Sequence, residues 1–368
     1  MPLSRTDRFL QFLNRYERAV SVATMIGGFS FDLVIAKRPD SVFVNVLLIV
    51  YLVVSAGVIA YLTRPARRSS LRAELDIAPI LAMKFAFGGL ASNLLILYSK
   101  SGTPAGSILF LVLLLSMLIG NEFLKTRYAE LRFNMSVWYL LLLTYCIIAV
   151  PTWLLHTIGF ASFLISGAVS VAAALVFLGA LDLATRIFRG REGRRHLGHA
   201  LGMIVGMLAF FTALYVTRTI PPVPLALRDI GIYHSVTRDA SGYAGIYEAA
   251  PWWAFWQASS DTYTMTAGGG NNAYCFSSVF APTGLTTPIH HRWEYFDPSS
   301  NQWITAAIVE YPITGGLEEG YHGYSIKSIP IMGEWRCDVE TAQNELIGRV
   351  SFTAVEGTSS PALLERSL

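Results

Sequence analysis

Four polar residues of the N-terminal half interrupt apolar segments, where they could move a proton or an ion. They are Asp32, Lys84, Asn93 and Glu122. A charged side chain inside a membrane is costly and marks a candidate transport path. A relay needs several such groups at one depth, and we expect these four to be scattered through depth. We therefore favour structural pairing, such as Lys84 with Glu122, and keep transport as the alternative.

Four histidines of the C-terminal part are candidate metal ligands: His234, His290, His291 and His322. His290 and His291 are neighbours in a predicted strand, where successive side chains point to opposite faces. They therefore cannot both bind one ion without distortion. We expect no metal site and no cofactor.

Cys275 and Cys337 are the two cysteines of the C-terminal part, whereas Cys146 lies in an apolar segment and is expected to pack there. Disulfides form in oxidising compartments, so this pair is a disulfide candidate if the C-terminal part is extracytoplasmic. A bridge closing a loop of about 60 residues would stabilise the fold by roughly 4 kcal/mol. Two core cysteines in different strands need not meet, so two unbridged thiols are the alternative.

Six of the eight tryptophans lie beyond residue 220. Trp252, Trp253 and Trp256 crowd into the segment Pro251–Trp256, which is too dense in aromatics for one strand face. Three uses remain open. The segment can lie at the headgroup level of a membrane, contact the helices, or form a ligand platform such as a sugar-stacking surface.

Familiar enzyme motifs are absent from the chain. HExxH, Walker A, GxSxG and GxGxxG do not occur, and their absence lowers the case for an enzyme. The last apolar run has no lysine that could bind retinal. Basic residues lie between apolar runs and form no single patch, which disfavours nucleic-acid binding.

Composition indicates which elements position these residues. The 368 residues are 53% hydrophobic and only 14% charged, whereas soluble domains carry about 25% charge. The net charge of +3 conceals two opposite halves. Residues 1–219 hold 21 basic and 10 acidic side chains, and residues 220–368 hold 7 and 15.

Seven apolar runs of residues 19–219 are long enough to cross a hydrocarbon layer of about 30 Å as helices. We expect helices over 19–36, 42–62, 77–98, 105–124, 134–155, 158–180 and 199–217. The first and last runs are rich in glycine and small residues, so six helices is the alternative count.

The distribution of Lys and Arg predicts an orientation. Segments 1–18, 63–76, 125–133 and 181–198 hold 16 basic residues, against 3 on the opposite side. Basic segments stay in the cytoplasm, so we expect a cytoplasmic N-terminus and an extracytoplasmic C-terminal domain. Residues 1–18 carry aromatic residues at helical spacing between arginines, which favours an amphipathic helix on the inner surface; a mobile tail is the alternative.

From residue 220 the sequence is typical of a β domain. Prolines in Ile220–Pro224 end the last helix. Short runs of alternating polarity then predict strands over 230–236, 273–280, 288–296, 302–310, 323–329, 333–340 and 346–355. We expect an antiparallel, immunoglobulin-like sandwich over 220–355 and a flexible tail over 356–368. In the strand 288–296, His291 and Trp293 share the core face, whereas Arg292 and Glu294 point outward.

Six stretches carry a resemblance: Gly120–Phe123, Ile220–Leu225, Cys275–Thr283, His290–Trp293, Gly320–Tyr324 and Gly333–Val339. Together they resemble an uncharacterised bacterial membrane-protein family whose C-terminal module is known as domain of unknown function 2914. The resemblance implies several membrane helices followed by a small β domain, and it brings no reaction and no catalytic residues. With the predicted orientation, it implies an inner-membrane protein with a periplasmic C-terminal domain.

We therefore expect a non-enzymatic membrane protein whose β domain binds a partner outside the cytoplasm, as an accessory or scaffolding subunit. Arg292, Trp293, Trp335 and Arg336 are expected near the recognition surface. The partners are the lipid bilayer and a membrane protein or a second copy of the chain. A transporter or channel is the alternative function, and a carbohydrate- or lipid-binding module using the tryptophans of 251–256 is the third.

Overall fold

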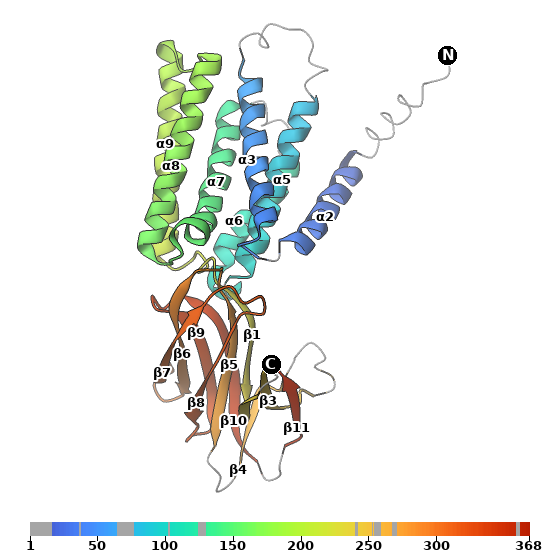
Figure 1. Ribbon diagram of the computed structural model, residues 1–368, viewed down its shortest axis with the longest axis vertical. Coiled ribbons are helices and arrows are strands. Elements are labelled where there is room, and N and C mark those ends of the chain that lie inside the picture. Colours follow the sequence, from blue (N-terminus) through green and yellow to red (C-terminus); the bar gives the residue numbers. More distant parts are fainter. Residues whose placement is uncertain are drawn as a thin grey trace, which may run out of the picture. The chain divides into compact units, whose positions relative to one another are not determined.

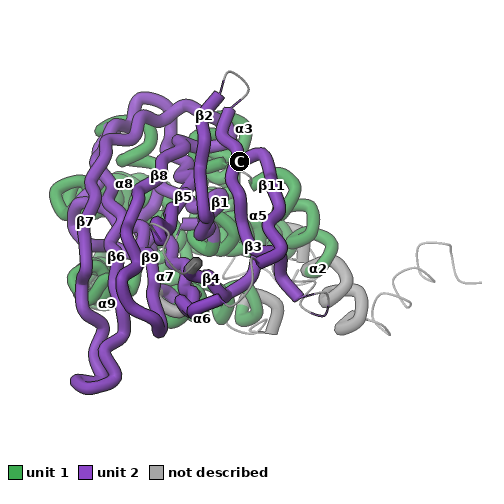
Figure 2. The backbone as a smooth tube through the Cα atoms, turned by 90° about the horizontal axis from the view of Figure 1, so that it is seen from below, with its two compact units in different colours: residues 1–99, 108–155, 160–220 green, residues 100–107, 156–159, 221–368 purple. Residues whose placement is uncertain are grey.

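The computed structural model describes residues 17–36, 38–64, 77–101, 104–123, 130–239, 242–251, 253, 259–266, 271–357 and 361–368. The chain divides into two units, drawn in green and purple in Figure 2. The first comprises residues 1–99, 108–155 and 160–220, and the second comprises 100–107, 156–159 and 221–368. All described strands belong to the second unit. Residues 1–16 of the expected amphipathic segment lie outside the described part.

The helical unit follows the predicted apolar runs (Figure 1). The described residues form seven α-helices and one π-helical turn: α2 (Glu17–Ile35), α3 (Val42–Leu62), α5 (Ile77–Ser99), α6 (Pro104–Phe123), α7 (Leu131–Val150), η3 (Pro151–Leu155), α8 (Phe160–Thr185) and α9 (Gly190–Val216). Among them, five helical segments are long and apolar enough to cross a membrane: α3, residues 79–99 of α5, α7 with η3, α8 and α9. In α2 and α6 the apolar stretches are shorter, so seven crossings stay a prediction.

α7 packs against α3, α5, α8 and α9. Two polar groups in this apolar interior bind partners on α3. Trp138 Nε1 donates to the Leu52 carbonyl at 3.0 Å, and the Tyr145 hydroxyl donates to Asn45 Oδ1 at 3.2 Å. Interhelical hydrogen bonds in membranes contribute about 1 kcal/mol each, so they fix the register of α7 on α3 more than they drive association.

α9 begins nine residues earlier than the apolar run at 199 indicates. Arg191, Arg194 and Arg195 lie in its first two turns. At 1.5 Å per residue, the nine residues before the apolar run lengthen the helix by roughly 13 Å. Arginine is a good helix former, so the hydropathy pattern marks where the apolar span starts and not where the helix starts.

The second unit holds eleven described strands: β1 (Ala226–Tyr233), β2 (Ser235–Asp239), β3 (Gly242–Glu248), β4 (Thr262–Thr266), β5 (Asn272–Phe280), β6 (Thr286–Asp297), β7 (Gln302–Thr314), β8 (Tyr321–Ser328), β9 (Gly333–Thr341), β10 (Leu346–Gly357) and β11 (Leu363–Ser367). They form three sheets, ordered β1-β5-β8, β4-β10-β9-β6-β7 and β11-β3-β2. All described pairs are antiparallel except β4, which runs parallel to β10.

The core lies between the first two sheets. Ala273 and Cys275 of β5 pack with Trp293, Cys337 and Phe352 of the five-stranded sheet. Alternation puts one apolar face of each sheet toward the other. The predicted all-β architecture with antiparallel sheets is therefore present.

A third sheet, β11-β3-β2, packs on the opposite side of β5, which the sequence analysis did not predict. Tyr233 and Phe276 form an apolar cluster there with Tyr243 and Tyr247. A Cβ at Gly245 would lie 2.6 Å from Cδ1 of Tyr233, so glycine is required for the Tyr233 ring to pack on β3. The glycines of β3 also hide its strand pattern, because they supply no side chain to alternate.

The expected flexible tail differs from the structure. β10 continues to Gly357, and Leu363–Ser367 form β11, which pairs with β3. The Arg366 guanidinium donates to Asp229 Oδ2 at 2.7 Å and to the Tyr233 hydroxyl. A five-residue strand held by one arginine carries too little periodicity to be recognised from sequence.

Candidate functional site

Two of the four polar residues that interrupt the apolar segments lie together. Asp32 of α2 lies beside Ser92 and Asn93 of α5, and all three are buried. Lys84 precedes Asn93 by nine residues on α5, which is roughly 13 Å along the helix. The side chain of Glu122 lies outside the described part, so its pairing with Lys84 stays a prediction. Asp32 and Asn93 thus form one local cluster.

Ionisable side chains of three neighbouring strands form what we call the charged face of the five-stranded sheet: His290, Arg292 and Glu294 of β6, Arg336, Asp338 and Glu340 of β9, and Arg349 of β10. Directly opposite residues of an antiparallel pair share one face. The register puts Arg292 opposite Asp338 and Glu294 opposite Arg336. The prediction that Arg292 and Glu294 share a face of β6 agrees with this register.

One end of the charged face is held by Glu340. Its Oε2 lies 2.8 Å from His290 Nε2 and accepts a hydrogen bond from Arg292 Nε at 3.0 Å. Arg292 also donates to Asn344 Oδ1 at 2.8 Å. The guanidinium is therefore fixed in position between two strands and a turn, which reduces the entropy lost when it meets a further partner.

The remaining carboxylates are paired in the same way. Glu294 Oε2 accepts from Arg336 Nε at 2.6 Å, and Asp338 Oδ1 accepts from Arg349 Nε at 2.6 Å. The hydrogen bond to Asp338 raises the pKa of Arg349. Glu294 and Asp338 are buried although they lie on an outer face, because the long arginine stems cover them. Buried charges are costly without a partner, so the face is fixed as one network.

β7 adds apolar side chains to the charged face. A β-bulge near Trp293 changes the alternation, so that Trp303 and Ile308 both lie on the side of Arg292. Ile308 is directly opposite Arg292 and is 53% exposed. The Arg336 guanidinium lies 4.1 Å from the centre of the Trp303 ring. β7 is the edge strand of its sheet, so this mosaic of Arg, Trp and Ile lies at the sheet margin.

The two tryptophans expected near the recognition surface lie in the core instead. Trp293 and Trp335 are 0% and 1% exposed. Trp293 Nε1 donates to Ser325 Oγ at 2.9 Å, and Trp335 Nε1 donates to the Ile331 carbonyl at 3.1 Å. Their side chains point to the inner face, where the second sheet covers them, so they cannot contact a partner directly.

Trp303 is an aromatic residue of the charged face that the sequence pattern did not mark as a candidate. The turn between β6 and β7 puts Trp303 opposite Phe296, and the two rings are 5.5 Å apart. The sequence feature that could have identified Trp303 is its expected pairing with Phe296 across the β6–β7 hairpin. Of the four residues predicted near the recognition surface, Arg292 and Arg336 lie on the charged face, whereas Trp293 and Trp335 lie in the core.

Among the crowded tryptophans, Trp253 is described and is exposed. Trp252 and Trp256 lie outside the described residues. The choice between a membrane-surface segment, a helix contact and a ligand platform therefore stays open.

Directly behind the charged face, His291 lies in a buried polar network. Its Nε2 is 2.9 Å from Ser277 Oγ and 2.8 Å from the Tyr311 hydroxyl, and its Nδ1 is 2.9 Å from Ser325 Oγ. Burial, with a smaller effect of His290, lowers the pKa of His291 to about 3. Ser277 and His291 have the spacing of a nucleophile and its base, but both are fully buried and cannot meet a substrate.

A disulfide joins Cys275 of β5 to Cys337 of β9, with a Cα–Cα distance of 6.5 Å. It links the two facing sheets. The sulfur atoms and a ring nitrogen of His291 lie within 4.8 Å of one another. Protein metal sites use cysteine as thiolate, and both His291 nitrogens already have hydroxyl partners. These three residues therefore do not fit a metal ion while the cysteines are bridged.

Residues 286–354 match the family described as "Protein of unknown function (DUF2914)". The match covers β6 to β9 and most of β10, and so contains the whole charged face. It supports the noted resemblance for a C-terminal domain of unknown function. No curated protein matches the chain.

Two solved structures show limited similarity. An immunoglobulin-like protein from Pseudomonas aeruginosa is 16% identical, with 34% of this chain and 97% of that chain covered and a TM-score of 0.19. The Pseudomonas fluorescens alkylpurine DNA glycosylase AlkC, solved with DNA containing an abasic site analogue, is 10% identical, with 84% and 98% covered and a TM-score of 0.21. At such TM-scores neither similarity supports an inference.

Proposed function

We propose that this chain is a multi-pass protein of the bacterial inner membrane whose periplasmic β domain is a non-enzymatic binding module for a protein partner. The charged face, together with Trp303 and Ile308, is the proposed contact surface. The helices that are long and apolar enough to span a membrane support the first part of the proposal. The distribution of basic residues supports the orientation.

The observation that carries the binding role is the mosaic of side chains on the charged face. Arg292 and Arg336 are held in place by carboxylates, and Ile308 and Trp303 lie beside them at the sheet margin. Tryptophan and arginine are enriched at binding hot spots. Preordered side chains bind with a smaller loss of entropy. The Ser277–His291 pair, by contrast, is sealed from solvent, which favours binding over catalysis.

A matched pair of variants tests this role. Ile308→Asp puts a charge at the centre of the proposed contact, whereas Ile326→Asp makes the same change on β8 of the other sheet, where Ile326 is 49% exposed. Both residues are surface-exposed, so each variant should change the free energy of unfolding by less than about 0.5 kcal/mol. Ile308→Asp should abolish the complex formed by the intact chain, and Ile326→Asp should leave it unchanged.

The measurement is photo-crosslinking in native membranes from positions 308 and 326, followed by mass spectrometry of the crosslinked species. We expect one defined partner, or a second copy of the chain, from position 308 alone. A solubilised protein that runs as a lone monomer with no crosslink from position 308 would refute the proposal.

Orientation is tested separately. A reporter that is active only in the cytoplasm, fused after Thr219, should be inactive, because the β domain is expected outside. An active reporter would reverse the assignment of sides while leaving the charged face as a candidate surface.

The carbohydrate-binding alternative has a different location. A hollow of about 490 Å³ in the β domain is lined by Tyr243, Glu319, Tyr321 and His322, among other residues. Aromatic rings combined with carboxylates suit sugar stacking and hydrogen bonding. If Tyr243→Ala, and not Ile308→Asp, reduced retention on envelope polysaccharide, this alternative would be preferred.

A further inference from the structure

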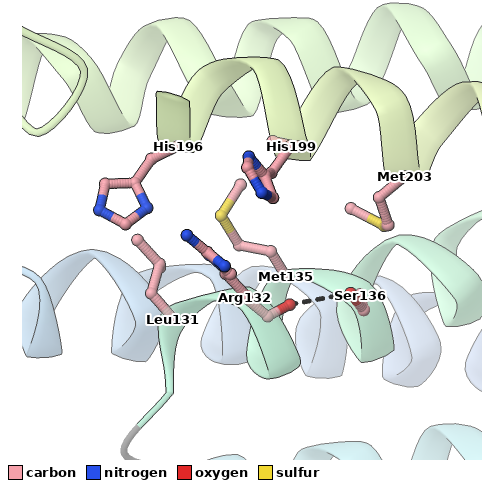
Figure 3. Close-up of a pocket in the computed structure, with 8 residues that line it drawn as sticks. Leu131, Arg132, Met135, Ser136, His196, His199 and Met203 are labelled. Atoms are coloured by element: carbon pink, nitrogen blue, oxygen red, sulfur yellow. Dashed lines mark hydrogen bonds between the residues drawn. The ribbon is translucent and has the colours of Figure 1, made fainter. Parts of the chain in front are cut away.

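The helical unit contains a pocket between α7 and α9, shown in Figure 3. Its volume is about 190 Å³, and it is lined by Leu131, Arg132, Met135 and Ser136 of α7 and by His196, His199, Ala200 and Met203 of α9. The labelled side chains of the two helices face each other across it. Both helices belong to the same unit, so the pocket is defined within that unit.

The pocket has a cationic side and an unused polar atom. Arg132 carries a permanent charge. Within the described part of the chain, His196 Nδ1 is buried and has no hydrogen-bond partner. His199 Nδ1 lies 2.7 Å from the Arg195 carbonyl, which can only accept, so this nitrogen carries the proton. Among the described residues that line the pocket, none is acidic.

The sequence around the pocket also has a net positive charge. From residue 130 to residue 203 the chain holds six arginines and three acidic residues, Glu130, Asp182 and Glu192. The Asp182 carboxylate accepts a hydrogen bond from the Phe188 backbone N–H at 3.1 Å. An anion is therefore the complementary occupant, because it would supply acceptors to Arg132 and to His196, whose Nδ1 makes no hydrogen bond within the described part of the chain.

The other side of the pocket is apolar. Leu131, Met135, Ala200 and Met203 contribute hydrocarbon and thioether surface. Histidine and methionine together also suit copper(I), but the Arg132 guanidinium in the same pocket opposes a cation. An anionic group carried on an apolar molecule matches both sides.

We propose that this pocket binds the phosphate of an anionic phospholipid. Arg132 and His196 would donate to the phosphate, His199 would line the pocket beside it, and the two methionines would contact the first part of the acyl chains. Segments 125–133 and 181–198, two of the basic segments predicted to be cytoplasmic, adjoin the pocket. Basic pockets between membrane helices on that side are known to hold lipid headgroups. The proposal concerns the helices and is independent of the partner of the β domain.

The test uses the intact chain in nanodiscs of phosphatidylcholine with or without phosphatidylglycerol. Native mass spectrometry after mild delipidation counts the retained lipid. We expect one phosphatidylglycerol on the wild type and no retained phosphatidylcholine. Arg132→Gln should lower the retained fraction at least about tenfold, since charge-assisted hydrogen bonds are lost. Arg132→Lys, which keeps the charge, should restore part of it.

Arg191→Gln is the matched control, because it removes the same charge from an exposed position of α9 that does not line the pocket. It should leave retention within about twofold of wild type, as expected of a screened surface charge. An equal loss in both variants would show general surface attraction and overturn the proposal. So would displacement of the lipid by millimolar inorganic phosphate, which identifies a site for the free anion, or retention of copper(I) in place of lipid.

A melting curve of each variant, followed by tryptophan fluorescence, checks that the helices remain folded. If Arg132→Gln unfolds the chain, His196→Gln provides the second test. His196 Nδ1 makes no hydrogen bond to any residue that the structure describes, so its loss should reduce lipid retention without unfolding α9. Unchanged retention in a folded His196→Gln variant would also overturn the proposal.

Discussion

On β6, His291 and Arg292 are adjacent residues, yet their surroundings are opposite. His291 faces inward, stays neutral, and is surrounded by the hydroxyls of Ser277, Ser325 and Tyr311. Arg292 faces outward and is held by the Glu340 carboxylate. Since side chains alternate along a strand, one residue of displacement separates a dry network of neutral groups from a network of paired charges.

The outer face of β6 is the one that is available for binding. The polar groups of the inner network form hydrogen bonds with one another between the two facing sheets. They therefore contribute to the specificity of the core. The outer network is also paired, but it borders the exposed Ile308 and the half-buried Trp303 of an edge strand. One face of this strand therefore specifies the core, and the proposed partner surface lies on the opposite face.

The largest expected effect comes from breaking the link between the two sheets. In the intact chain, Cys275→Ala combined with Cys337→Ala should lower the free energy of unfolding of the β domain by about 4 kcal/mol, as expected from the entropy of the 62-residue loop. Urea unfolding followed by tryptophan fluorescence measures it, because most tryptophans lie in this domain. Cys146→Ala in α7 is the control and should not shift this transition. An unchanged midpoint in the double variant would show that the sheets hold together without the bridge.

The outer network should respond to loss of a single carboxylate. Asp338→Asn leaves Arg349 with a neutral partner and should cost about 2 to 3 kcal/mol, below the 3–5 kcal/mol of a fully buried pair because Arg349 is partly exposed. Glu310→Gln, an exposed change on β7, should cost less than about 0.5 kcal/mol. Hydrogen exchange of peptides covering β9 and β10 measures the difference. Equal exchange in the two variants would mean that the ion pairs contribute little.

The inner network should respond to pH. The unfolded chain takes up a proton at His291 below about pH 6.5, whereas the folded chain does so only near pH 3. The free energy of unfolding should therefore fall by about 2 kcal/mol between pH 7 and pH 5. Urea titrations across this range measure it.

His291→Gln, which cannot titrate, isolates this effect from other groups. Its stability should be lower at pH 7 but should change less between pH 7 and pH 5. The pKa of Glu248 is also displaced: burial would raise it, but hydrogen bonds from His234 and Thr264 outweigh burial and lower it. That carboxylate loses its contribution only at more acidic pH, below the window tested. If the variant showed the same slope as wild type, His291 would not be the responsible group.

Period-two alternation predicted much of the β domain. The two faces of β6 and much of the strands from β5 to β10 follow it, because the core side of each sheet is covered by the other sheet. The rule also placed Trp293 and Trp335 inward, so expecting them at a recognition surface gave their residue type too much weight. Whether Cys275 meets Cys337 depends on how the sheets face each other, which no local pattern contains.

Elements stabilised by distant contacts escaped prediction. β3 and β11 are short, and they form because Tyr233 packs on Gly245 and Arg366 reaches Asp229. Trp303 became part of the charged face through a β-bulge, which shifts alternation by one residue. The pocket between α7 and α9 likewise joins residues at least 60 positions apart, and hydropathy alone gives no sign of it.

The bridge between Cys275 and Cys337 also constrains the order of events during maturation. Both cysteines are fully buried between the sheets, and the loop they close contains β6, β7 and β8. An external oxidant can reach the thiols only before the sheets close or when they separate again. Once formed, the bond is shielded from reductants for as long as the sandwich stays shut. The rate of thiol exchange in the mature protein therefore measures how often the two sheets part.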